Sequence, residues 1–215
     1  MPNAIPVLYE STTSPNSRRV RFFIAEKGIH IDRKPVDLSV KEQFSGAYTA
    51  INPRNQVPAL VLADGTVITE VLAIWRYLEE AYPSAPLLGT NSKTKALVAM
   101  WERRAELDGF APVMEGVRNA IAGLKGRALS GPHAYEQIPE LVERSRQRVA
   151  NFFEDFNERL ATVPFVAGDE FSAADITTLV TVDFSANALK MSIPETHSAF
   201  RQWYDRVSSR PAAGA

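Results

Sequence analysis

The sequence between Asn52 and Trp75 holds two features that suggest ligand binding. The first is Pro58, which lies just before a short apolar run, where it fixes φ and removes one backbone donor at the start of a strand. If the Val57–Pro58 peptide bond is cis, it turns the backbone of Val57 outward. The N–H and C=O groups of Val57 are then free to pair with an extended peptide.

The second feature is Glu70, which we expect in the first turn of a helix. The helix dipole favours a carboxylate there by about 0.3–1 kcal/mol, so a capping charge alone explains the residue. A carboxylate that faces a ligand ammonium, beside free helix amides that hold a ligand carboxylate, is the alternative explanation. The residues alone favour the capping charge.

The elements that must position these residues form a small α/β pattern. Asp64-Gly65 predicts a type I′ hairpin turn, and the apolar stripe that starts at Val71 predicts the helix after it. A right-handed crossover makes the first two strands parallel, and the hairpin adds two antiparallel strands, which is the thioredoxin-like arrangement. The expected elements are strands over 4–9, 34–38, 59–63 and 66–68, a hydroxyl-rich loop over 10–17, and helices from Ser17 or Arg18 to Gly28, over 40–48 and from residue 69 onward.

The composition excludes several kinds of chemistry. The chain has 215 residues and no cysteine, which excludes disulfides, thiolate metal sites and protein-thiol redox motifs. His30, His133 and His197 lie far apart without metal-ligand spacing, so we expect no metal. A net charge of −1 without a basic block predicts no nucleic-acid partner. Without a membrane-length apolar run or a signal-peptide pattern, a cytoplasmic protein with no membrane partner is expected.

The chain is expected to have two domains. Residues 83–92 are rich in proline, serine and glycine and predict a linker. They separate a first domain over 1–82 from a second domain over 93–215, in which only helical periodicity appears. The predicted fold class is therefore α+β, with a thioredoxin-like N-terminal domain followed by an all-α helical bundle.

One helix start in the second domain is sharply specified by the sequence. Ser172 fits the N-cap position and Asp175 the N3 position of a capping box. Phe171 and Ile176 fit the flanking hydrophobic staple. We therefore expect Asp175 to stabilise the fold and to have no catalytic role.

These features together resemble the cytosolic glutathione S-transferases, of a serine-type or thiol-reductase-like class. The resemblance covers nearly the whole chain. Val-Pro alone is a weak motif, but four features in the same order over this length are a strong one, and they favour the ligand-binding explanation of Glu70. The four features are Gln-Val-Pro-Ala-Leu at 56–60, Asp64-Gly65, Thr69-Glu70 and the cap at 171–175.

The resemblance implies how glutathione binds as co-substrate. The backbone of Val57, before Pro58, pairs with the cysteinyl residue, and Glu70 with position 71 holds the γ-glutamyl group. Gln56 resembles the side chain that reaches the glycyl end. Lys41 is either a second contact there or a solvated helix lysine.

The chain departs from the family pattern at Val71. The family usually has serine there, and its hydroxyl binds the γ-glutamyl carboxylate. Valine keeps the backbone N–H but lacks the hydroxyl, and a hydrogen bond to a charged group contributes about 1.5–3 kcal/mol. We therefore expect weaker glutathione binding than in a relative with serine.

The resemblance also locates the group that activates the glutathione thiol, at the end of the first strand or the start of the first helix. Ser14-Pro15-Asn16 resembles the serine-type pattern, so Ser14 is expected to donate to the sulfur with Asn16 as a second donor. Tyr9 falls within the strand and is expected in the core. Lowering a thiol pKa by about two units from about 8.5 takes about 2.7 kcal/mol, which such donors can supply. The other candidates are Ser11, Thr12, Thr13 and Ser17.

Three functions lead from the sequence, and a serine-type isomerase of small unsaturated acids is a fourth alternative, although the family motif for it has further small polar residues where this chain has Pro15-Asn16. The leading one is a glutathione transferase of detoxification, a homodimer in which the thiolate attacks a small hydrophobic electrophile. Its second substrate is expected between the domains, although Phe110 and Met114 fit a core position equally well. A glutathione-dependent disulfide or peroxide reductase is the first alternative, suggested by Ser-Pro-Asn, and a non-catalytic interaction module is the second, suggested by Val71. The expected second-substrate contacts are Arg104, Phe110, Met114 and Arg118.

Overall fold

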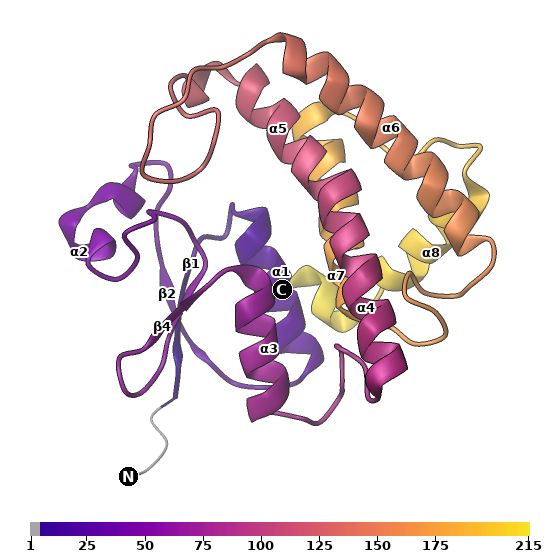
Figure 1. Ribbon diagram of the computed structural model, residues 1–215, viewed down its shortest axis with the longest axis horizontal. Helices are drawn as coiled ribbons and strands as arrows, with labels where there is room; N and C mark the ends of the chain where they lie inside the picture. The colour runs from indigo at the N-terminus through magenta and orange to yellow at the C-terminus, as the bar shows by residue number, and fades with distance from the viewer. Residues whose placement is uncertain (1–4) are drawn as a thin grey trace. The chain divides into compact units, whose positions relative to one another are not determined.

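A computed structural model describes residues 5–215, so Ala4, the expected start of the first strand, lies outside the described residues. The chain forms two compact units (Figure 1). The N-terminal unit extends to Ala85 and also includes Ser130–His133 and Ala215. The helical unit comprises Pro86–Leu129 and Ala134–Gly214.

The N-terminal unit is built on a four-stranded sheet with the strand order β2-β1-β3-β4. Strand β1 (Val7–Glu10) pairs in parallel with β2 (Asp32–Pro35) and antiparallel with β3 (Ala59–Val61). Strand β4 (Val67–Thr69) pairs antiparallel with β3. The predicted parallel pair and antiparallel hairpin are confirmed, and the sheet has the thioredoxin-like arrangement.

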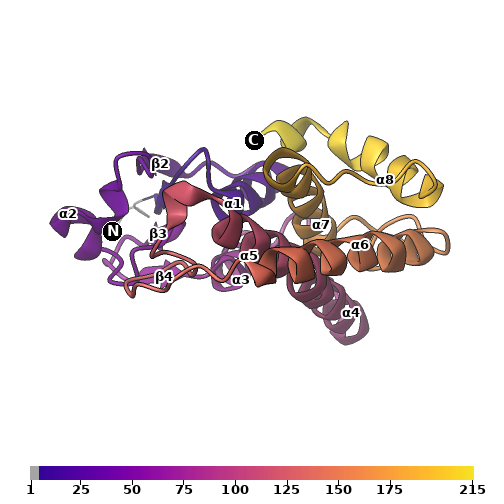
Figure 2. The same cartoon turned by 90° about the horizontal axis from the view of Figure 1, so that it is seen from above.

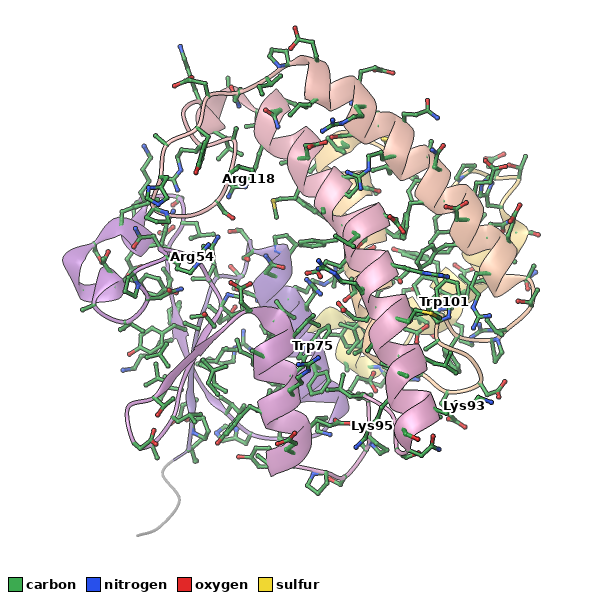
Figure 3. All side chains as sticks on the ribbon, viewed as in Figure 1. Arg54, Trp75, Lys93, Lys95, Trp101 and Arg118 are labelled. Carbon is green, nitrogen blue, oxygen red and sulfur yellow. The ribbon has the colours of Figure 1, made fainter. Side chains whose placement is uncertain are left out.

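Two helices of this unit pack against each other through aromatic rings. Phe23 of α1 stacks on Trp75 of α3 with the ring centroids 5.2 Å apart, and Trp75 is labelled in Figure 3.

Helix α1 starts earlier than the predicted Ser17 or Arg18, because Ser14 caps it and proline is favoured at the first helical position. The helices of the unit are α1 (Pro15–Glu26), the short η1 (Glu42–Phe44) and α2 (Gly46–Thr49), and α3 (Val71–Ala81).

The turn between β3 and β4 is not the predicted type I′ turn. That turn needs positive φ at both central residues, but within this turn only Gly65 has it, at +86°. The carbonyl of Leu62 accepts the N–H of Gly65 (3.0 Å), and the side chain of Asp64 accepts the N–H of Thr66 (2.9 Å). Asp64 therefore stabilises the loop through its carboxylate while its backbone keeps an ordinary φ.

The second unit consists of helices, as predicted, and no strand longer than an isolated bridge occurs in its described residues. Figure 2 shows α5 and α6 running side by side. The backbone of Gly109 packs directly against the ring of Phe152, and a Cβ added to Gly109 would lie only 2.7 Å from that ring. The elements are α4 (Ser92–Arg104), η2 (Ala105–Phe110), α5 (Ala111–Ala120), η3 (Ala122–Leu124), α6 (Glu140–Leu160), α7 (Ala173–Phe184), η4 (Ser185–Leu189), α8 (Ser198–Ser208) and η5 (Pro211–Gly214).

The predicted capping box at the start of α7 is confirmed. The carboxylate of Asp175 accepts the N–H of Ser172 (3.0 Å), the N–H of Val166 (2.9 Å) and the indole N–H of Trp203 (2.8 Å). Asp175 is fully buried, and this burial raises its pKa to about 6 despite the opposing hydrogen bonds. One carboxylate therefore joins the start of α7 to α8 and to the chain segment before α7.

The raised pKa of Asp175 gives folding stability a defined pH dependence. Because the folded pKa lies above its ordinary value of 3.8, the folded state binds more protons between about pH 4 and pH 6. Stability contributed by Asp175 is therefore fully present below this window and falls as the pH rises through it. A shift of this size corresponds to about 3 kcal/mol.

We expect the stability advantage of the wild type over Asp175→Asn to be largest near pH 4 and to shrink toward pH 7. Urea unfolding at a series of pH values measures it. An advantage that grows over the same range would mean that the folded state lowers the pKa of this carboxyl.

Candidate ligand-binding site of the N-terminal unit

The strand register brings the predicted binding segments to one end of the sheet. Tyr9 of β1 lies opposite Ala59 of β3, which lies opposite Thr69 of β4. The chain therefore leaves β1 into the serine-rich loop, enters β3 from Pro58 and leaves β4 toward Glu70 at the same end. Segments far apart in the sequence thus meet at one edge.

The serine-rich loop is fixed by hydrogen bonds among three serines. The Oγ of Ser14 caps α1 by accepting the N–H of Ser17 (3.3 Å), and the N–H of Ser14 donates to the carbonyl of Ser11 (3.1 Å). The Oγ of Ser17 accepts the N–H of Ser11 (3.2 Å). A capping oxygen acts as an acceptor, so the hydroxyl proton of Ser14 remains able to donate to a ligand.

A buried carboxylate holds the same loop from the end of β1. Glu10 is 3% exposed and accepts from Arg21 (2.5 Å) and twice from Arg33 (2.5 and 2.9 Å). The guanidinium of Arg21 also donates to the carbonyl of Ser11 (3.2 Å). Burying a carboxylate is costly unless it is paired in this way. Sequence reasoning missed this cluster, although an arginine on the buried face of α1 was a signal for it.

The other two predicted donors near this loop have defined partners. Asn16 accepts from the guanidinium of Arg19 (3.2 Å) through its side-chain oxygen, which leaves its amide N–H groups to donate. Tyr9 lies in β1 as expected but is half-buried, and its hydroxyl accepts from the ammonium of Lys34 (3.3 Å). Asn16 therefore keeps its amide donors for an anion, and the hydroxyl of Tyr9, which accepts from Lys34, keeps its own proton as a donor.

The segment before β3 is fixed by hydrogen bonds to the carbonyl of Gln56. The Val57–Pro58 bond is cis. The carbonyl of Gln56 accepts from the hydroxyl of Tyr48 (2.6 Å) and from the side-chain amide of Asn52 (2.7 Å). Burial raises the pKa of Tyr48 to about 12, so its hydroxyl remains a donor at neutral pH. Within the described residues, the backbone N–H and C=O of Val57 have no hydrogen-bond partner.

The junction between β4 and α3 has an unusual backbone conformation at Glu70. This residue is the N-cap of α3 with φ 67° and ψ 130°, a region that costs a non-glycine residue about 1–3 kcal/mol. Glu70 therefore lies one residue before the first turn in which it was expected, and its side chain is exposed and makes no capping hydrogen bond. Val71 begins α3 with a buried side chain, and the first amides of a helix have no intrahelical acceptor.

Lys41 lies apart from these contacts. It is exposed, has a φ of 61° and is the N-cap of η1. Its ammonium makes no hydrogen bond or ion pair with any described residue. The ammonium therefore stays available to a ligand as far as residues 5–215 are concerned.

The four predicted second-substrate residues belong to the helical unit. Phe110 is buried, with its ring centroid 6.1 Å from that of Phe184, and Met114 is half-buried on α5. The guanidinium of Arg104 lies over the ring of Trp101 at 4.8 Å. Arg118 donates to the carbonyl of Arg127 (2.7 Å), and burial lowers its pKa.

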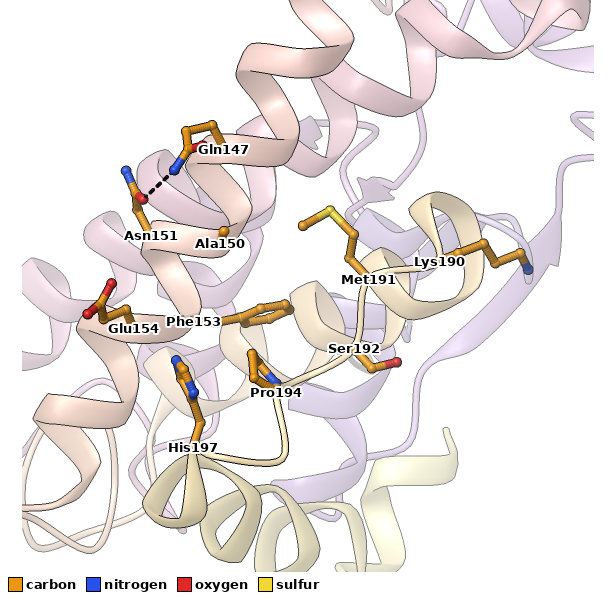
Figure 4. Close-up of a pocket in the computed structure, with 10 residues that line it drawn as sticks. All are labelled: Gln147, Ala150, Asn151, Phe153, Glu154, Lys190, Met191, Ser192, Pro194 and His197. Atoms are coloured by element: carbon orange, nitrogen blue, oxygen red, sulfur yellow. Dashed lines mark hydrogen bonds between the residues drawn. The ribbon is translucent and has the colours of Figure 1, made fainter.

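Two further features of the helical unit escaped sequence reasoning. The helix between α4 and α5 widens into a π-helix at η2, a form that is frequent at functional sites. A hollow of about 450 Å³ lies between α6 and the segment before α8, with Asn151, Glu154 and His197 in its lining (Figure 4).

Among the described residues, no cluster of three or more ligating side chains could hold a metal ion. No described helix is long and apolar enough to cross a membrane.

Comparison with known proteins identifies both halves of the chain. Residues 13–81 match the model of the glutathione S-transferase N-terminal domain, and residues 139–206 match that of the C-terminal domain. Glutathione S-transferase 2 of Saccharomyces cerevisiae is 32% identical over 96% of this chain and 87% of its own. Disulfide-bond oxidoreductase YfcG of Escherichia coli is 27% identical over 96% of this chain and 92% of its own. A solved glutathione S-transferase domain-containing protein of Marinobacter aquaeolei VT8 superposes with a TM-score of 0.88 at 32% identity, over 96% of this chain and 98% of that one.

The Glu10 cluster predicts a large effect of removing one arginine. Arg21→Met leaves a buried carboxylate whose one remaining charged partner among residues 5–215 is Arg33. Breaking a buried pair costs about 3–5 kcal/mol, and we expect the lower end here because Arg33 remains. Urea unfolding measures the loss.

The double variant Glu10→Gln/Arg21→Met serves as the control, because it removes the charge as well as its partner. We expect it to recover much of the lost stability. A single variant within about 0.5 kcal/mol of the wild type, the range of ordinary surface substitutions, would show that the cluster does not stabilise the loop.

Proposed function

Because this chain belongs to the glutathione S-transferase family, we propose that glutathione binds at the sheet end where Ser14, Val57 and Glu70 meet. The chain is an enzyme that uses glutathione as co-substrate, as its family membership and its relatives indicate. The observation that supports the location is the register of β1, β3 and β4, which aligns the three segments.

In the proposed complex, the two ends of the tripeptide have different partners. The unpaired N–H and C=O of Val57 bind the cysteinyl backbone in the manner of an added strand. The carboxylate of Glu70 faces the γ-glutamyl ammonium, and the first amides of α3 hold the γ-glutamyl carboxylate. The side chains of Gln56 and Lys41 bind the glycyl end.

Ser14 is proposed to activate the thiol by stabilising its anion. Its hydroxyl proton donates to the sulfur, with an amide N–H of Asn16 as the second donor. These hydrogen bonds favour the thiolate over the thiol, so the thiol pKa falls and the proton leaves to solvent without a general base. The thiolate then attacks an electrophilic carbon of the second substrate and forms a carbon–sulfur bond. Either a leaving group departs with its electron pair, or, at an activated double bond, the neighbouring carbon takes a proton from solvent.

The second substrate is proposed to be a small hydrophobic electrophile. The half-buried Met114 offers an adaptable apolar surface, and Arg104 and Arg118 offer positive charge for a leaving group or a developing anion. Phe110 supports this wall from the core.

A homodimer with a detoxifying role in the cytoplasm completes the proposal. The exposed apolar side chains of Met100 in α4 and Leu107 in η2 support it, because apolar side chains at the surface can be buried by a second copy. Light scattering that gives a monomer mass at micromolar concentration would contradict the dimer.

A glutathione-dependent disulfide reductase is the second candidate. The disulfide-bond oxidoreductase relative and the Ser14-Pro15-Asn16 pattern favour it. In this reaction a glutathione thiolate attacks one sulfur of the substrate disulfide, breaks the S–S bond and releases the first substrate thiol, leaving a mixed disulfide. A second glutathione attacks the glutathione sulfur of that mixed disulfide, releasing the second substrate thiol and glutathione disulfide. Turnover of small disulfides faster than of electrophilic carbon compounds would favour this reaction over transfer.

Replacing Ser14 tests the proposed activation. Ser14→Ala is expected to raise the pKa of bound glutathione toward the value of about 8.5 for a free thiol, because a donor to the anion is lost. Ultraviolet absorbance of the thiolate measures this pKa. Ser14→Thr retains a hydroxyl and should keep it low, and an unshifted titration in Ser14→Ala would remove Ser14 from this role.

Replacing Val71 tests the departure from the family pattern. Val71→Ser is expected to tighten glutathione binding about 10- to 100-fold, since it adds a hydroxyl donor to the γ-glutamyl carboxylate. Val71→Ala is the matched control, because it removes the same apolar bulk without adding a donor. Equal dissociation constants for the serine and alanine variants, by calorimetry, would contradict the prediction.

A further inference from the structure

The tip of the loop between α5 and α6 belongs to the N-terminal unit. Residues Ser130–His133 group with that unit. The side-chain amide of Gln56 donates to the Oγ of Ser130 (2.9 Å). Gly131 is buried against the same segment, since a Cβ added to it would lie 3.8 Å from Nε2 of Gln56 and 3.9 Å from the carbonyl of Arg54.

The loop that carries this tip is braced by its own hydrogen bonds. The N–H of Ala128 donates to the carbonyl of Tyr135 (3.0 Å), and the N–H of Tyr135 donates to the carbonyl of Gly126 (3.0 Å). Gly131 has a φ of +127°, which favours glycine over other residues. The tip is therefore a shaped turn with Ser130 beside its glycine.

The contact between Gln56 and Ser130 leaves two donors that make no hydrogen bond with any residue that the structure describes. A primary amide has two N–H groups, and Ser130 accepts one of them. The hydroxyl of Ser130 accepts this bond, so its own proton is still able to donate. Ser130 is exposed and Gln56 half-buried, which keeps both donors within reach of a ligand.

The position of these donors is fixed from the backbone side. The carbonyl of Gln56 is bound by both Tyr48 and Asn52, so the residue has little freedom to turn. The next residue is Val57, whose unpaired backbone is the proposed partner of the cysteinyl residue. A ligand that pairs there extends toward Gln56 with its next residue.

We propose that Ser130 is a further glutathione-binding residue, which with Gln56 forms a two-donor cradle for the glycyl carboxylate. The two donor atoms lie side by side and can each bind one carboxylate oxygen, the arrangement that makes bidentate recognition specific. This inference rests on the proposed function, because it takes glutathione as the ligand that pairs with Val57.

The expected effect of Ser130→Ala is confined to binding. We expect the glutathione dissociation constant and KM to rise about 10-fold, because a hydrogen bond to a charged group is lost. The turnover number at saturating glutathione should stay unchanged, since the glycyl carboxylate is remote from the sulfur. Ser130→Thr keeps the hydroxyl and should bind almost as the wild type does.

A modified ligand separates recognition of the carboxylate from a structural effect. Glutathione esterified at its glycyl carboxylate lacks the charge that the cradle binds. Calorimetry should show that the wild type prefers glutathione to the ester, and that Ser130→Ala loses about 10-fold of this preference. A structural defect would weaken both ligands equally.

The outcomes distinguish this inference from the proposed function. A wild type that binds glutathione, with an unchanged preference over the ester in Ser130→Ala, would overturn the role of Ser130 and leave the proposed function standing. A wild type that binds neither ligand would overturn both.

Discussion

The buried carboxylate of Glu10 is the constraint on which the proposed activation site depends. A charged group that is 3% exposed is tolerated only with strong partners, and Arg21 and Arg33 supply them from α1 and β2. Arg21 also donates to the carbonyl of Ser11, so the side chain that pairs with Glu10 also fixes the backbone of the serine-rich loop. The hydroxyl of Ser14 thus takes its position from an ion pair that need not touch the ligand.

At the other two binding segments, protein side chains or the backbone conformation likewise fix the chain and leave nearby groups for a ligand. Tyr48 and Asn52 bind the carbonyl of Gln56, and this leaves the backbone of Val57 free. At Glu70 a positive φ directs the chain into α3 and leaves the carboxylate exposed. Buried side chains hold the backbone, and the exposed groups are then available to a peptide ligand.

Local patterns in the sequence predicted much of the fold and less of the site. The strand pairing and the capping box at Asp175 were confirmed, because they depend on periodicity and on residues close in the chain. The turn at Asp64 was predicted wrongly, since Asp-Gly also fits a loop in which only the glycine has positive φ. The contact between Gln56 and Ser130 joins residues 74 positions apart, and no local pattern encodes such a distance. The roles of Ser14, Glu70 and Val71 remain predictions.

The proposed glutathione site can be tested by calorimetric titration of the wild type and Glu70→Ala with glutathione and with glutathione disulfide. We expect the wild type to bind glutathione and Glu70→Ala to bind it at least 10-fold more weakly, about the effect of one lost bond between charged groups. Glu70→Gln, which keeps the shape without the charge, separates electrostatics from geometry. Equal affinities in the wild type and Glu70→Ala would contradict the proposed site, and a preference for the disulfide would assign the chain to reduction.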